Sequence, residues 1–283
     1  MSLRLDRLVT VYLANPLRRQ LRIGGSCIPI LMYHSISDTS EEGKHPYYRT
    51  VTSPSVFAQH MEYLHENGYS TIAPSQAADQ LIQGGAMASA KVAVITFDDA
   101  FADFHRNAFP MLKKYSFTAT VYIPTGFVKD SRTSFKSHEC LTWNEIRELQ
   151  SSGISFGSHT VTHPQLYDLA EPLIKEEVEA SKQTIEQQLG APVDSFAYPF
   201  AFPDADPGFK KVLQEILGRA GYRNGVCTSI GTAKPGDNPF FLKRLPANGC
   251  DDLALFGAKL SGAYDWLSQP QYFSKLAKKW SGS

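Results

Sequence analysis

The 283-residue chain lacks an excess of charge, a paired cysteine motif and a long apolar run. Its 28 basic and 28 acidic side chains cancel, so no overall field attracts nucleic acid or an anionic membrane. Cys27, Cys140, Cys227 and Cys250 lie far apart, without the C-x-x-C spacing of a zinc knuckle or redox motif. No run is long enough to span a bilayer. We therefore expect no transmembrane segment, and a partner that is uncharged or zwitterionic and is not nucleic acid.

Residues 1–27 form an N-terminal extension that lacks the apolar core of a signal peptide. Only a few apolar residues stand between Arg7 and Asn15, and Pro16 and several arginines follow them. Leu and Val alternate with Arg and Tyr in a way that permits a short amphipathic helix, which either packs on its own domain or lies on a membrane surface. The expected location is the cytoplasm, with membrane association through the N-terminus as an open alternative.

Between residues 28 and 250, short apolar runs alternate with longer stretches of helical periodicity. This alternation is typical of a parallel sheet with crossover helices. The expected strands are IPILMYH, YSTIA, KVAVITF, FTATVYIP, ISFGS, VDSFAYPF, YRNGVCTSI and FFLKRLP. One expected helix is 54–67, with Ser53 as its cap and Val56, Met61 and Leu64 on its apolar face. Other expected helices are 106–115, the segment that begins after Thr142 with Glu145 completing its cap, and 171–189. No linker marks a second domain, so we predict a single barrel-like α/β domain, with a helical tail over 251–283.

Two motifs with metal-binding side chains follow apolar strands. Asp98 and Asp99 end the run KVAVITF, and His159 and His163 stand in the loop segment GSHTVTHPQL. Active-site groups gather at the carboxyl ends of parallel strands, so both motifs are expected at one end of the fold. A catalytic zinc takes three protein ligands, and a second carboxylate beside them could deprotonate the water. The alternatives are a solvated turn or helix cap for the aspartates and surface positions for the histidines.

The residues Thr96-Phe97-Asp98-Asp99, His159-Thr-Val-Thr-His163-Pro164 and Phe196-Ala-Tyr-Pro-Phe200 resemble motifs of the polysaccharide deacetylase family, also called NodB-like or carbohydrate esterase family four. The resemblance covers about residues 28–250 and implies a distorted (β/α) barrel of seven to eight strands. It implies that Asp98 is the general base and that Asp99, His159 and His163 hold one divalent metal ion. Zinc is the expected ion, and nickel, cobalt or iron would also suit these ligands. Tyr198, Pro199 and Phe200 are expected to contact the substrate.

The sequence departs from this family at two catalytic positions. Ala197 stands where fuller motif sets carry an Arg that keeps the catalytic Asp ionised, and Arg244 in the last strand is our candidate replacement. The alternative for Arg244 is a surface position on the barrel rim. No histidine follows His163, so the family's usual C-terminal general acid is missing. His34, at the end of the first strand, is our candidate acid, because its Tyr-His pair resembles deacetylases of poly-N-acetylglucosamine exopolysaccharide; His105 and His138 are weaker candidates.

The resemblance implies a metal-dependent hydrolase that removes N-acetyl groups from N-acetylhexosamine units of a polysaccharide or lipid-linked glycan, as in exopolysaccharide biosynthesis. One alternative is an allantoinase-like amidase acting on a small cyclic ureide. Another is a carbohydrate-binding protein of exopolysaccharide assembly that has lost turnover, which the missing Arg and C-terminal His keep open.

Overall fold

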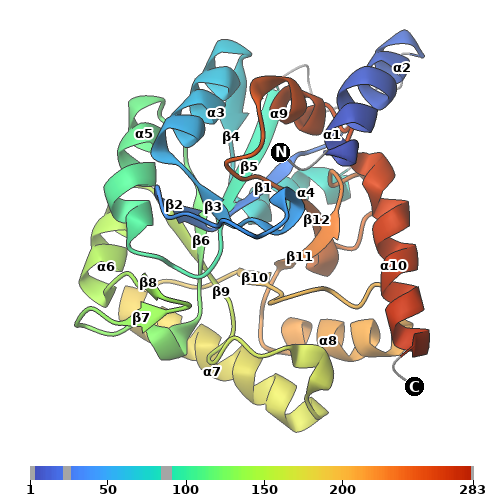
Figure 1. Cartoon of the computed structure of the whole chain (residues 1–283). Coiled ribbons are helices and arrows are strands. Elements are labelled where there is room, and N and C mark those ends of the chain that lie inside the picture. The colour runs from blue at the N-terminus through green and yellow to red at the C-terminus, as the bar shows by residue number, and fades with distance from the viewer. Residues whose placement is uncertain (1–3, 22–26, 84–90, 282–283) are drawn as a thin grey trace.

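A computed structural model describes residues 4–21, 27–83 and 91–281 of the chain (Figure 1). Residues 1–3 and 22–26 of the expected extension, and 282–283 of the expected tail, lie outside this description. The strands are β1 (Ile30–Tyr33), β2 (Ser35–Ile36), β3 (Val51–Thr52), β4 (Tyr69–Thr71), β5 (Lys91–Phe97), β6 (Thr120–Ile123), β7 (Ser134–Phe135), β8 (His138–Glu139), β9 (Ser155–Ser158), β10 (Ser195–Ala197), β11 (Asn224–Ile230) and β12 (Leu242–Pro246).

The α-helices are α1 (Leu5–Val9), α2 (Asn15–Gln20), α3 (Pro54–Glu66), α4 (Pro74–Gln83), α5 (Phe109–Lys114), α6 (Trp143–Ser151), α7 (Glu171–Leu189), α8 (Pro207–Arg219), α9 (Leu253–Leu260) and α10 (Ser268–Ser281). Seven short helical turns complete the described part of the chain: η1 (Thr10–Ala14), η2 (Pro46–Tyr48), η3 (Phe104–Ala108), η4 (Thr125–Phe127), η5 (Leu166–Asp168), η6 (Pro239–Phe241) and η7 (Asp265–Leu267).

Seven parallel strands close into a barrel in the order β1-β12-β11-β10-β9-β6-β5, because β5 pairs back onto β1. The eighth strand, β4, pairs with residues 91–93 of β5, whereas residues 94–97 of β5 pair with β1. The Val94 N–H donates to the Pro29 carbonyl on the β1 side, whereas the Ala93 carbonyl accepts from the Ile72 N–H after β4, so β4 and β1 lie on opposite edges of β5. β4 thus shares its edge of β5 with β6, which pairs with residues 96–97, and this accounts for the expected seven to eight strands: seven close the barrel and β4 is the additional one. The predicted single-domain (β/α) barrel is confirmed.

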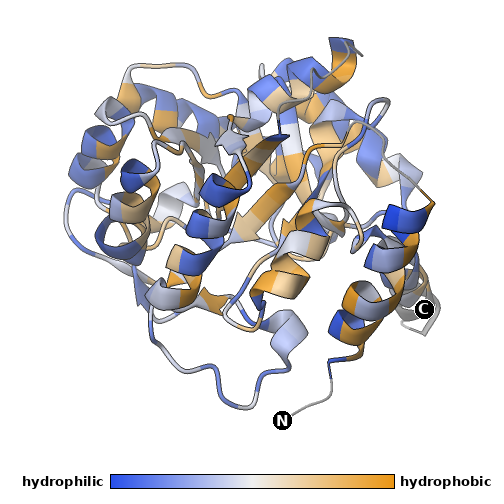
Figure 2. Ribbon diagram, turned by 90° about the horizontal axis from the view of Figure 1, so that it is seen from above, coloured by the Kyte–Doolittle hydropathy of each residue, from blue (hydrophilic) through white to orange (hydrophobic). Residues whose placement is uncertain are grey.

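Parallel strands with helices on their outer faces are buried on both faces, and the strand sequences show this. Residues 93–97 of β5 and all four residues of β6 are buried. Figure 2 shows the apolar strands in the interior, with polar residues frequent on the surrounding helices. A near-continuous apolar run is therefore what such a strand requires, because neither face meets water.

The helix-start signals in the sequence are confirmed. Ser53 accepts a hydrogen bond from the Val56 N–H at the start of α3. Thr142 and Glu145 form the expected reciprocal capping box at the start of α6. One face assignment was wrong: the buried side chain of the first turn of α3 is Phe57 instead of Val56, which is only half-buried.

The N-terminal and C-terminal helices lie together outside the barrel (Figure 1). The segment α1–η1–α2 packs against α9, burying Thr10, and leaves Leu13, Leu17 and Leu21 more than half exposed. None of the described helices has both the length and the apolar character needed to cross a bilayer. Contact between this segment and a membrane surface stays a prediction.

Candidate active site

Asp98 and Asp99 follow directly after β5, where the backbone turns sharply. Asp99 and Ala100 have positive φ values of 73° and 50°, which are uncommon for residues other than glycine. The segment before α6 holds this turn in place, because the Leu141 N–H donates to the Ala100 carbonyl at 2.8 Å. Such strained backbone persists only where surrounding contacts enforce it, and it often occurs at functional sites.

The loop after β9 folds back so that His159 and His163 converge. Glu177 of α7 accepts hydrogen bonds from the backbone N–H groups of residues 161 and 162 and from the Thr162 hydroxyl. Gly126 lies under the loop, and a Cβ there would stand 2.7 Å from the Val161 carbonyl oxygen, so glycine is needed for this close approach. The hydrogen bonds from the loop to Glu177 and the close approach of the loop to Gly126 thus bring the two histidines together.

Asp99, His159 and His163 form a compact set of potential metal ligands. One ligand atom from each lies within 4.8 Å of the others. His159 Nδ1 lies 2.7 Å from the Ala197 carbonyl and donates to it, which leaves Nε2 free to bind a metal. Burial lowers the pKa of His159 to about 3, which keeps it in the neutral form that a metal requires. Two imidazoles and a carboxylate suit a divalent ion of the zinc type, so the residues present fit the expected cofactor.

Arg244 of β12 is fully buried and forms a two-pronged ion pair with Asp98. Its Nη1 and Nη2 each lie 2.7 Å from one carboxylate oxygen of Asp98. Nε donates to the Cys227 carbonyl and Nη1 also donates to the Thr96 hydroxyl, so the guanidinium is fixed on several sides. Arg244 is therefore not a rim residue. Burial alone would raise the pKa of Asp98, but the charge of Arg244 and its hydrogen bonds lower it to about 2.

His34 lies at the carboxyl end of β1, on the Asp98 side of the site. Its Nε2 is 3.9 Å from Asp98 Oδ2, and its side chain is 19% exposed. Burial lowers the pKa of His34, and the nearby carboxylates of Asp98 and Asp99 only partly oppose this. The two weaker candidates face other partners, because His105 pairs with Glu148 and His138 packs against Phe101.

In the third motif, residues 196–200, the Phe200 side chain is exposed beside the metal-ligand set, whereas the Tyr198 side chain is buried elsewhere. The Phe200 ring is 48% exposed and lies 4.7 Å from the His163 ring, centre to centre. Tyr198 is only 1% exposed and packs against Phe202 and Phe209, and its N–H donates to the Val226 carbonyl. β10 thus turns the Tyr198 side chain towards α8, and contact of Tyr198, Pro199 and Phe200 with the substrate stays a prediction. Pro199 has no N–H, so Phe200 is the remaining backbone donor of the three.

Lys136 was missed by the sequence argument, although it reaches the ligand set. Its Nζ lies 3.1 and 3.3 Å from the two Asp99 carboxylate oxygens and 3.4 Å from His163 Nε2. It stands in the two-residue turn between β7 and β8, where Lys136 and Ser137 have φ values of 49° and 64°. Such turns favour Asn-Gly because both positions need positive φ, so the sequence Lys-Ser gives no turn signal.

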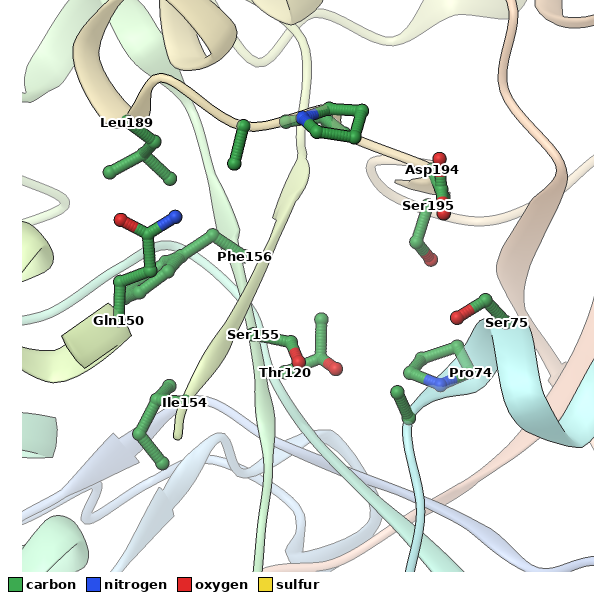
Figure 3. Close-up of a pocket in the computed structure, with 14 residues that line it drawn as sticks. Pro74, Ser75, Thr120, Gln150, Ile154, Ser155, Phe156, Leu189, Asp194 and Ser195 are labelled. Carbon is green, nitrogen blue, oxygen red and sulfur yellow. The ribbon is translucent and has the colours of Figure 1, made fainter. Parts of the chain in front are cut away.

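A cavity lies at the amino-terminal end of the barrel strands, opposite the end that carries the aspartates and histidines, and none of the predicted site residues line it (Figure 3). It measures about 230 Å³. Its lining includes Thr120, Ser155 and Ser195, the first residues of β6, β9 and β10. The amino-terminal end of such barrels normally serves stability, whereas chemistry occurs at the carboxyl end. The site is therefore sought at the end that carries the aspartates and histidines.

Comparison with known sequences gives one consistent family. The sequence profile of the polysaccharide deacetylase family matches residues 86–225. Bacillus subtilis YxkH, whose name assigns it provisionally to the polysaccharide deacetylases, is 30% identical over 231 residues, covering 82% of this chain and 75% of that protein. Staphylococcus aureus poly-beta-1,6-N-acetyl-D-glucosamine N-deacetylases are 24% identical over 160 residues. This chain spans about half the length of those staphylococcal relatives, 52%.

Solved structures with the same fold point the same way. The Streptococcus pyogenes deacetylase PplD, solved in complex with acetate, is 28% identical with a TM-score of 0.72, over 84% of this chain and 99% of that one. IcaB from Ammonifex degensii is 25% identical with a TM-score of 0.67, over 85% of this chain and 98% of that one.

Proposed function

We propose that this chain, which belongs to the polysaccharide deacetylase family, is a metal-dependent hydrolase that removes N-acetyl groups from N-acetylhexosamine units of a glycan. The observation that carries the proposal is the pairing of two adjacent carboxylates with different partners. Asp98 is held by Arg244, and Asp99 stands with His159 and His163. One carboxylate is thus available for proton transfer and the other for a metal.

Asp98 is proposed as the general base that takes a proton from the attacking water. The charge of Arg244 keeps Asp98 ionised and therefore able to accept a proton. The two hydrogen bonds from Arg244 also fix the orientation of the carboxylate. A positioned general base of this kind contributes about 10²–10⁴ in rate.

A divalent ion held by Asp99, His159 and His163 would, when bound, lower the pKa of a water and polarise the acetamide carbonyl. The chain adds a neutral donor for the charge that develops on the carbonyl oxygen. The Phe200 N–H is the candidate, because the Tyr198 N–H is engaged with Val226 and Pro199 has none. Donors aimed at developing charge are worth about 10²–10³ in rate.

His34 is proposed as the general acid. As the C–N bond breaks, the amine nitrogen takes a proton from His34 Nε2, and acetate and the free amino sugar leave. Its lowered pKa makes protonated His34 a stronger acid than free imidazole, so it releases the proton readily. Asp98 and His34 stand 3.9 Å apart, close enough to serve one reaction centre from two sides.

The alternatives differ from this proposal in what they need at the site. A metal-free amidase has no use for the buried set of Asp99, His159 and His163. A binding protein that had lost turnover would not need Asp98 held in a fixed orientation by the buried Arg244. A metal-free amidase and a binding-only protein therefore leave the arrangement of these five side chains unexplained, whereas a metal-assisted amidase acting on a cyclic ureide would use the same side chains and differs from the proposal in its substrate.

Acetate release from acetylated glycans tests the proposal directly. We expect release from β-1,6-linked or β-1,4-linked N-acetylglucosamine oligosaccharides when zinc, nickel or cobalt is supplied, and no release after chelation. The β-1,6 linkage is included because of the staphylococcal relatives. Retained oligosaccharide binding with no acetate under any of the three metals would favour the binding protein instead.

We expect His34→Ala to keep metal and lose turnover of acetamides by about 10²–10⁴, the usual contribution of a general acid. With 4-nitrophenyl acetate the loss should be much smaller, because that leaving group departs without a proton. His105→Ala is the matched control, since His105 pairs with Glu148 away from the aspartates. Equal losses on both substrates would show that His34 acts in some other way than as the acid.

A further inference from the structure

A groove of about 600 Å³ lies beside the proposed active site and has no assigned role. Such a volume is in the range of about 300–1,000 Å³ typical of small-molecule sites. Its walls come from four parts of the chain: residues of α1; His45, Tyr47 and Tyr48 before β3; Ala201 after β10; and residues of η7 and α10. All except Ala201 lie outside residues 86–225, which match the family profile. The groove is therefore built largely by segments that this profile does not include.

The aromatic wall of the groove is exposed but rigidly held. Tyr48 is 68% exposed, and its ring meets the Tyr47 ring edge to face with centres 4.9 Å apart. His45 Nδ1 accepts a hydrogen bond from the Tyr47 N–H. The buried Asn248 donates to the carbonyls of Pro46 and Arg49 on either side of the two tyrosines. An exposed ring on an anchored turn needs little further ordering to bind a ligand.

The groove is connected to the metal side of the site through short, fixed contacts. Gln271, which lines the groove, donates to the Thr228 carbonyl. The Thr228 hydroxyl donates to the Phe200 carbonyl at 2.8 Å. The Phe200 ring in turn lies against His163. Ala201, the next residue, is part of the groove wall, so the groove begins where the proposed acetamide site ends.

We infer that the groove binds sugars that neighbour the one being deacetylated, with one pyranose ring stacked on Tyr48. This inference rests on the proposed function, because it takes the substrate to be an extended glycan. A sugar ring presents apolar C–H faces with hydroxyls at its edge, and the groove offers the exposed Tyr48 ring beside the half-buried Tyr47, with Ser274 among its polar lining residues.

Binding of oligosaccharides of different length tests the inference. Affinities for N-acetylglucosamine and for its β-1,6-linked and β-1,4-linked pentasaccharides are measured by calorimetry, with His34→Ala as the parent protein to suppress turnover, because this variant keeps the Asp98–Arg244 ion pair and the three potential metal ligands. We expect the parent to prefer a pentasaccharide, and Tyr48→Ala in that background to weaken pentasaccharide binding about tenfold, as for a contact residue of the hot-spot kind. Tyr48→Phe keeps the ring and should restore binding.

Tyr12→Ala is the matched control, because Tyr12 is 62% exposed and does not line the groove. It should change the affinity by less than about twofold, as for an ordinary surface substitution. The inference is overturned if Tyr48→Ala binds the pentasaccharide like its parent, or if the parent shows no preference for length. Length-dependent binding without acetate release by the unsubstituted protein would reject the hydrolase and keep the groove.

Discussion

Replacing Asp99 or His163 by alanine is expected to empty the metal site and abolish turnover. Each substitution removes one of three ligand atoms that lie within 4.8 Å of one another. Loss of a partner that only supports a metal ligand costs about 10–100-fold in metal affinity, so loss of a ligand itself should cost more than about 100-fold. Metal content by elemental analysis after dialysis measures this directly. Near-stoichiometric metal in either variant would remove that residue from the ligand set.

Lys136→Ala provides the matched control for this experiment. Lys136 Nζ lies 3.1 Å from Asp99 Oδ2 and 3.4 Å from His163 Nε2, but an ammonium has no lone pair to offer to a metal. The variant keeps all three ligand atoms, and it removes a cation that competes for Asp99. We therefore expect it to take up metal at least as tightly as the unsubstituted protein. Circular dichroism of all three variants separates loss of metal from loss of fold.

Arg244→Met is expected to destabilise the protein by about 3–5 kcal/mol, the usual effect of removing one partner from a buried ion pair. Asp98 would then be a buried carboxylate without its bidentate cation. The unfolding midpoint in urea measures the loss. Turnover should fall as well, because without the guanidinium the pKa of Asp98 rises and its orientation is released. A stability equal to that of the unsubstituted protein would show that the pair is not formed as described.

Two further variants test whether the loss of stability in Arg244→Met comes from breaking the buried Asp98–Arg244 ion pair. In the double variant Asp98→Leu with Arg244→Met, both charges are gone, and we expect most of the lost stability to return. Arg223→Met removes an Arg from an ion pair with Asp79 in which both side chains are about half exposed. That change should cost less than about 1 kcal/mol, because water screens exposed pairs. Equal costs for Arg223→Met and Arg244→Met would contradict a special role for burial.

Acid should weaken the same contact in the unsubstituted protein. The pKa of Asp98 is lowered from 3.8 to about 2 in the folded state, so folding favours its ionised form. The resulting stability is fully present above pH 3.8 and is lost as the pH falls through about 2. In Arg244→Met this part of the pH dependence of unfolding should disappear.

Much of the fold could be predicted from local patterns, because those patterns are local in origin. A strand buried on both faces must be apolar along its length, and β5 and β6 are. A helix start needs acceptors for its free N–H groups, and Ser53 and Thr142 supply them. The π-turn η3 was not expected within the helix predicted near Arg106. Pro110 has no N–H, and a wider turn before it avoids the clash that a regular helix would suffer.

The aspartate and histidine motifs could also be found in the sequence, because each lies within a few residues after one strand. The contacts that hold the histidine loop in place could not be found in the sequence, because they come from Glu177 and Gly126 in other segments. The sequence left two alternatives for Arg244, a replacement for the missing Arg and a surface position on the barrel rim. Closure of the barrel by β1 between β5 and β12 decided between them, by bringing a buried guanidinium from β12 to Asp98.

The sequence by itself determined the alternation of strands and helices, the chemical types at the site and the absence of a spanning segment among the apolar runs. Tertiary structure alone decided which side chains meet. Lys136 reaches Asp99 from a hairpin without turn signals, and Tyr48 shares one groove with Ala201 and with residues from near both ends of the chain. The physical reason is that strand and helix preferences act over a few residues, whereas a site and a groove require contacts between segments far apart in the chain.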